Sequence, residues 1–137
     1  MKSKYAIDMV HHNPGEPRFN SRYNDPAALK AMGYKGKVYS LFESPVLAVD
    51  WNDVEPGLFD GDSEAWRHEL ASRLKKEFQN CKQHGLNVFA MSDMVLFPKK
   101  LVEKYGMNAT FGDANNPFTV KYLKVLFDLI FTQFPEM

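Results

Sequence analysis

A polar cluster follows the first strand-like segment of the chain, and its side chains are of types that recognise sugars. His11, His12, Asn13 and Glu16 lie in a stretch with two prolines and a glycine, which predicts a loop. Imidazole, amide and carboxylate groups can hydrogen-bond sugar hydroxyls, while aromatic rings supply the apolar contact. The alternative interpretation is that Asn13 only shapes a turn and that both histidines are solvated.

Two further candidates for contact with a sugar lie at the ends of apolar stretches. Asp93 follows the stretch 86–91, so we expect it at a strand end; the alternative is a carboxylate that caps the next segment. Trp51 is the best placed aromatic residue for stacking on a sugar ring. Tyr39 and Phe42 are weaker candidates, because aromatic residues in a strand pattern more often belong to the core.

A metal site is the competing interpretation of the same residue types. Asp8, one of His11 and His12, and Asp93 have side chains that suit zinc or a similar divalent ion. Adjacent histidines in a strand point to opposite faces, so only one of the two could face a shared centre. We therefore predict no metal site. No cofactor is expected either, since P-loop, GxGxxG and HExxH motifs are missing from the sequence.

The composition is that of a folded protein without a nucleic-acid or membrane signature. The 137 residues are 45% hydrophobic, and 17 basic residues balance 17 acidic ones, so no basic binding surface is expected. No signal-peptide pattern follows Met1, and no apolar run reaches the roughly 18 residues of a membrane span. We expect a cytoplasmic chain, although the parent protein could be exported. Cys81 is the one cysteine and is expected in the core.

Strand and helix patterns alternate along the chain, which predicts an α/β protein with a parallel sheet and helical crossovers. The expected strands and helices are 5–10, 26–32, 37–42, 63–84, 86–91, 98–105 and 117–133. A second apolar stretch, 45–51, is interpreted as a bulged continuation of the second strand or as a loop excursion.

Two of the predicted helices make specific demands on their surroundings. In the helix 63–84, one face repeats at helical spacing and is expected to pack in the core; its members are Trp66, Leu70, Leu74, Phe78 and Cys81. The helix 117–133 is apolar nearly all round, so it requires cover on all sides.

The polar landmarks of the chain form an ordered series. They are HNPGEP at 12–17, DP at 25–26, GYKGKV at 33–38, HGLNV at 84–88, Asp93, FPKKLVEKY at 97–105 and FPE at 134–136. This series covers nearly the whole chain and resembles the N-terminal part of a poorly characterised group of bacterial TIM-barrel proteins that look like glycoside hydrolases. The resemblance implies that residues 1–137 are a single domain, a partial (β/α)8 TIM barrel of about three β/α units with parallel strands.

The same resemblance implies a carbohydrate-active protein. In that group a Phe-Pro-Glu motif precedes a fourth strand that carries a carboxylate, and this sequence ends at Met137, before such a strand. We therefore expect the catalytic residues beyond Met137 and no glycosidase turnover from this chain alone. The substrate-binding residues are expected to be His11, His12, Asn13, Glu16, Trp51 and Asp93.

Two alternatives to the carbohydrate-active interpretation stay open. The chain could be a non-catalytic fragment or an interaction module, which forms homo-oligomers through open sheet edges and the uncovered last helix. It could also be a metal-dependent hydrolase.

Overall fold

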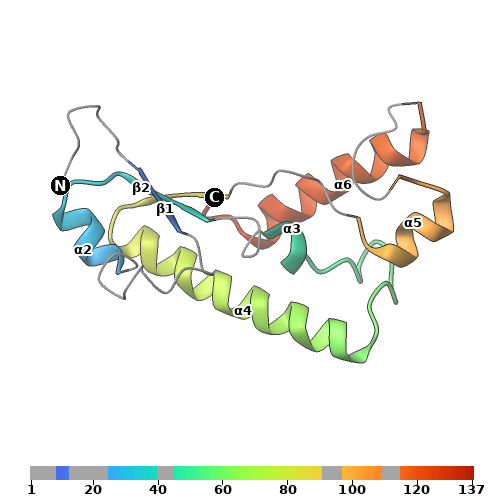
Figure 1. The fold of residues 1–137 in the computed structure, drawn as a ribbon, viewed down its shortest axis with the longest axis horizontal. Helices are drawn as coiled ribbons and strands as arrows, with labels where there is room; N and C mark the ends of the chain where they lie inside the picture. The colour runs from blue at the N-terminus through green and yellow to red at the C-terminus, as the bar shows by residue number, and fades with distance from the viewer. Residues whose placement is uncertain (1–8, 13–24, 40–44, 91–96, 109–114) are drawn as a thin grey trace.

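The structure is a computed structural model that describes residues 9–12, 25–39, 45–90, 97–108 and 115–137 (Figure 1). Along the chain, the elements are β1 (Met9–His12), α2 (Pro26–Ala31), β2 (Gly36–Tyr39), α3 (Pro45–Ala48), α4 (Gly61–Gln83), β3 (Asn87–Ala90), α5 (Lys99–Tyr105) and α6 (Pro117–Gln133). The alternation expected from the sequence is confirmed for these residues, and the chain is of the α/β class. Among the described helices, none has the length and apolarity that crossing a membrane requires.

Among the described residues, three parallel strands form an open sheet in the order β1-β2-β3. The backbone register places His11 opposite Val38, and Val38 opposite Phe89. Parallel neighbours require a crossover between them, and α2 and α4 supply the two crossovers. The prediction of side-by-side strands that run in one direction is therefore confirmed.

Helix α4 covers one face of the sheet and supplies most of the core there. The ring of Tyr39 packs edge-on against Phe78, with 4.9 Å between the ring centroids, and its hydroxyl lies 3.4 Å from the sulfur of Cys81. Burial raises the pKa of both the Tyr39 hydroxyl and the Cys81 thiol. Leu70 and Leu74 are buried on the same helix face, so the predicted stripe is confirmed over these positions.

In the part of the chain that the structure describes, the opposite face of the sheet is less covered. Val88 is buried toward α4, whereas its neighbour Phe89 is 45% exposed. This difference follows from the strand period of two, which sends successive side chains to opposite faces.

The interpretation of residues 45–51 as strand or loop was wrong for its first four residues, which form α3. Pro45 opens this helix, and a proline suits the first helical position because its missing N–H would have no partner there. The prediction that His11 and His12 lie in the loop after the first strand was also wrong, since both belong to β1.

The prediction that Trp66 packs in the core was wrong, because its side chain is 52% exposed. The N-terminal half of α4 extends beyond the sheet toward α5 (Figure 1). There the helix packs against α3 instead, and Arg67 points at the carbonyl of Ala48. The buried position is therefore taken by Arg67, which is 1% exposed.

From the sequence, Asp25 and Asn116 are expected to cap α2 and α6, Gly106 to end α5, and Asp62 or Ser63 to cap the helix 63–84. The last of these predictions was wrong, because α4 begins at Gly61, and the others are confirmed. The side chain of Asp25 accepts a hydrogen bond from the amide of Ala27, and the side chain of Asn116 accepts one from the amide of Phe118. Gly106 ends α5 in the left-handed conformation, with φ of 60°. These caps satisfy backbone groups that the helices leave without partners.

Gly106→Ala is expected to lower the free energy of unfolding by about 1 kcal/mol, because an L-residue is strained at positive φ. A Cβ at Gly106 would meet no heavy atom within 4 Å, so backbone strain is the sole cause. Gly61→Ala is the matched control: Gly61 also has open space around it, but it lies in α4 with an ordinary φ. Urea unfolding of both variants measures the difference, and equal stabilities would contradict the prediction.

Candidate functional site

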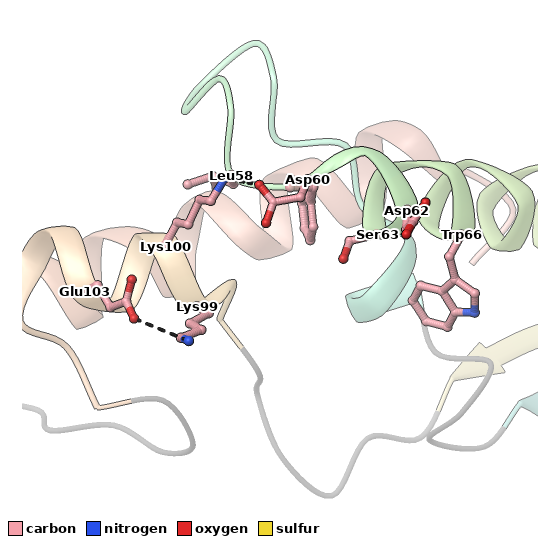
Figure 2. Close-up of a pocket in the computed structure, with 9 residues that line it drawn as sticks. Leu58, Asp60, Asp62, Ser63, Trp66, Lys99, Lys100 and Glu103 are labelled. Atoms are coloured by element: carbon pink, nitrogen blue, oxygen red, sulfur yellow. Dashed lines mark hydrogen bonds and ion pairs between the residues drawn. The ribbon is translucent and has the colours of Figure 1, made fainter.

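A surface pocket of about 630 Å³ lies between the N-terminal turns of α4 and helix α5 (Figure 2). One wall comes from the end of the β2–α4 connection and the first turns of α4, and the other comes from α5 in the β3–α6 connection, so both follow the carboxyl ends of strands. In a parallel β/α arrangement these connections form the functional face. The lining residues are Leu58, Phe59, Asp60, Asp62, Ser63, Trp66, Lys99, Lys100 and Glu103.

The exposed indole of Trp66 forms one end of this pocket. Figure 2 shows it extending from α4 on the side of Ser63, with Asp62 one helical turn before it. Residues four apart on a helix share a face, so a carboxylate and an aromatic ring are presented together. Such a combination offers an apolar platform beside hydrogen-bonding groups, as a sugar ring requires.

The lysines of the pocket are held by its own carboxylates. The ammonium of Lys100 lies 2.5 Å from Asp60, and that of Lys99 lies 3.7 Å from Glu103. Within the described part of the chain, the side chains of Asp62 and Ser63 have no hydrogen-bond or ion-pair partner. The groups left to meet a ligand are thus a hydroxyl, a carboxylate and an indole, which favours a neutral polar ligand over a phosphate.

A smaller cavity of about 120 Å³ adjoins the pocket, and the two share Phe59 and Trp66. Its other walls are apolar and come from α3, from the segment after α3 and from the residues that precede α5: Val46, Leu47, Trp51, Phe97 and Pro98. Phe59 and Trp66 therefore each line both the pocket and this apolar cavity.

The β2–α4 connection is fastened to α4 by the buried guanidinium of Arg67. Arg67 donates two hydrogen bonds to Glu64, at 2.9 and 2.5 Å, and one to the carbonyl of Ala48 at 3.3 Å. Its charge also lies 3.5 Å from the carboxylate of Asp50. The guanidinium lowers the pKa of Glu64, and Glu64 in turn raises the pKa of Arg67.

The same connection is joined to α6 at a second point. The amide of Asp50 donates to the side-chain oxygen of Gln133, and the side-chain nitrogen of Gln133 donates to the carbonyl of Asp50, both at 2.7 Å. A glutamine amide that pairs with a backbone amide in this way satisfies both groups at once. The segment next to Trp51 is therefore fixed to two helices.

A third fastening is made by Glu55, whose carboxylate is buried among polar groups of α5 and α6. Lys104 donates to it at 2.8 Å and the hydroxyl of Tyr105 at 2.5 Å, and the hydroxyl of Tyr122 donates to the same carboxylate. Hydrogen bonds to its charged form lower the pKa of Glu55 to about 2. Burial, together with the hydrogen bond to Glu55, raises the pKa of Tyr122. This cluster sets the distance between α5 and the connection that carries Asp60.

The structure places the residues predicted to bind substrate as follows. His11 and His12 lie at the carboxyl end of β1, the end from which site residues are expected. Asn13, Glu16 and Asp93 lie outside the described residues, so their roles stay predictions. Trp51 is 2% exposed and packs in the core, which is a correction, because a ring must present a free face to stack on a sugar.

The pocket residues Asp62, Ser63, Trp66 and Glu103 were missed by reasoning from the sequence. Helical spacing assigned Trp66 to the core stripe, and nothing in the sequence shows that the first turns of α4 project beyond the sheet. Asp62 was considered only as a helix cap. The signal that could have found the site is an aromatic residue within two turns of a helix start that follows a long connection.

Within the residues that the structure describes, no group of three or more histidine, cysteine, aspartate or glutamate side chains could hold a metal ion. Comparison of the chain with protein-family models, with curated proteins and with solved structures gave no match in any of the three. The functional assignment therefore depends on the geometry of the pocket and its position in the fold.

Proposed function

We propose that this chain is the N-terminal part of a carbohydrate-active (β/α)-barrel protein of glycoside hydrolase-like type, and that the pocket at Trp66 binds a sugar ring. The observation that carries the proposal is the exposed indole of Trp66 in a pocket built from the two strand-to-helix connections. Parallel strand order supports the barrel, and the strand-to-helix side is where barrels place their sites.

Binding, and not hydrolysis, is the role proposed for this pocket. Asp60 and Glu103 are each paired with a lysine, so these two carboxylates serve the walls of the pocket. Asp62 and Ser63 supply hydrogen bonds to sugar hydroxyls, and Trp66 supplies the apolar face. The pocket is lined by three carboxylates and two lysines, and this excess of negative charge favours a neutral sugar over an anionic one.

Trp66→Ala is expected to weaken binding of a neutral oligosaccharide at least about tenfold, because loss of about 1.4 kcal/mol of stacking corresponds to a factor of ten. Isothermal titration with cello-, xylo-, malto- and chito-oligosaccharides measures the affinity of the wild-type chain and of the variant. Trp66→Phe keeps an aromatic face and should retain part of the affinity.

The matched control is Val54→Ala, which trims a side chain that is also exposed, at 41%, but does not line the pocket. It should bind like the wild type. If none of the four sugar series binds, or if Trp66→Ala binds as tightly as Val54→Ala, the sugar-binding assignment is wrong.

A further inference from the structure

The outer surface of α6 carries an exposed apolar stripe. Helix α6 buries Thr119, Tyr122, Leu126 and Ile130 against the rest of the molecule. On its other side, Val120 is 57% exposed, Phe127 46% and Phe131 55%. Steps of seven and four residues keep these three side chains on one line along the helix. A soluble protein rarely leaves such a line of large apolar groups in water unless it is a contact surface.

Lys124 and Asp128 are the charged residues of α6 that lie nearest to this stripe, and Lys121 lies farther round the same side of the helix, over the ring of Tyr122. All three are exposed, and within the described residues the side chains of Lys124 and Asp128 have no ion-pair partner. At a rotation of 100° per residue, all three fall on the same side of the stripe, with the positive charges nearer the start of the helix. This edge of the stripe therefore carries positive charge followed by a negative charge.

The order of Lys124 and Asp128 along this edge is self-complementary when two copies of α6 run antiparallel. A two-fold axis at the middle of the stripe, between residues 125 and 126, runs two copies of α6 antiparallel and keeps the same edge of both helices on the same side. Lys124 of each copy then lies opposite Asp128 of the other, and Val120 lies opposite Phe131. A parallel pair would place the charged edges on opposite sides of the contact, so they could not meet.

We infer that α6 is a self-association surface, through which two copies of this chain pair antiparallel about a two-fold axis. A two-fold interface uses one surface twice, which matches a stripe that is complementary to itself. Equal numbers of acidic and basic residues, 17 of each, leave no net charge to oppose the approach of two copies. The surface lies on other elements than the Trp66 pocket, so the inference goes beyond the proposed sugar binding.

Sedimentation velocity over a range of concentrations tests the pairing. The wild-type chain is expected to pass from monomer to dimer as concentration rises, and Phe127→Glu is expected to stay monomeric, since it places a charge in the apolar stripe. Circular dichroism checks that the variant is folded, which its exposed position favours. A wild-type chain that stays monomeric throughout would overturn the inference.

Charge reversal tests the antiparallel arrangement itself. Lys124→Glu alone and Asp128→Lys alone are each expected to weaken dimerisation at least tenfold, because each puts like charges opposite one another twice. An equimolar mixture of the two variants is expected to dimerise like the wild type, since every facing pair is again of opposite sign. Lys76→Glu, at an exposed position on α4, is the control and should dimerise normally. If the mixture fails to recover, or if either single variant dimerises like the wild type, the arrangement is wrong.

Discussion

Arg67→Leu is expected to lower the free energy of unfolding by about 2 to 3 kcal/mol, because it removes the charge-assisted hydrogen bonds of a buried guanidinium whose carboxylate partners are partly exposed. The guanidinium is 1% exposed and holds Glu64, the carbonyl of Ala48 and the charge of Asp50. A leucine fills part of the space but removes these hydrogen bonds, so that Glu64 keeps only Asn52 and His68 as partners. Chemical unfolding followed by circular dichroism measures the loss.

The matched control for this substitution is Arg73→Leu, on the same helix. Arg73 is exposed, and a surface charge contributes less than about 1 kcal/mol. Arg67→Lys should fall between the two, because an ammonium keeps the charge but cannot span Glu64 and Ala48 with one planar group. Equal stabilities of the Arg67→Leu and Arg73→Leu variants would show that Arg67 does not hold the connection together.

Glu55→Gln is expected to lower the free energy of unfolding by up to about 3 kcal/mol at pH 7. The carboxylate is 8% exposed and receives hydrogen bonds from Lys104, Tyr105 and Tyr122. An amide keeps the shape of the side chain, but it turns one acceptor oxygen into a donor that faces these donors. It also removes the charge that Lys104 meets.

The pH dependence of stability identifies the same group. Because the pKa of Glu55 falls from 4.5 to about 2 on folding, the folded carboxylate binds its proton less readily than the unfolded one. Its contribution is therefore fully present above pH 4.5 and is lost as the pH falls from 4.5 toward 2. The wild-type chain should lose stability over this range more steeply than Glu55→Gln. Glu103→Gln, at an exposed carboxylate, is the control and should follow the wild type; parallel curves for wild type and Glu55→Gln would contradict the assignment.

These two residues explain why the pocket keeps its shape. Arg67 fixes the β2–α4 connection to α4, while Glu55 fixes the same connection to α5 and α6. The connection, α4 and α5 carry the residues that line the pocket. Loss of either anchor should therefore also weaken any ligand that contacts Trp66. This effect is indirect. A direct contact is distinguished by Trp66→Ala, which is expected to lose ligand affinity while it costs at most about 2 kcal/mol of stability, because only about half of the side chain is buried.

Local signals in the sequence were sufficient for the helices other than α3 and for the parallel order of the strands. Asp25 and Asn116 cap the helices that they were expected to cap, and Gly106 ends α5. These features depend on a residue and its neighbours within one turn, so they can be predicted from the sequence. The alternation of strand and helix predicted parallel pairing because such units pair in only a few ways.

The roles of the two tryptophans could not be predicted in this way. Helical spacing states which residues share a face, but it does not state which neighbour covers that face. Trp66 shares a stripe with Leu70, yet α4 extends past the sheet at that point and leaves the indole exposed. Trp51 ends an apolar stretch, and α3 with its neighbours encloses it instead.

The sequence by itself determined the class of the fold, the bounds of most helices and the shortage of cover on α6, because each depends on local spacing and capping. Only the tertiary structure decided where the pocket lies and what supports it. The bonds of Glu55 join residues 49, 50 and 67 positions apart, and contacts over such separations arise from packing of whole elements, which no local pattern encodes.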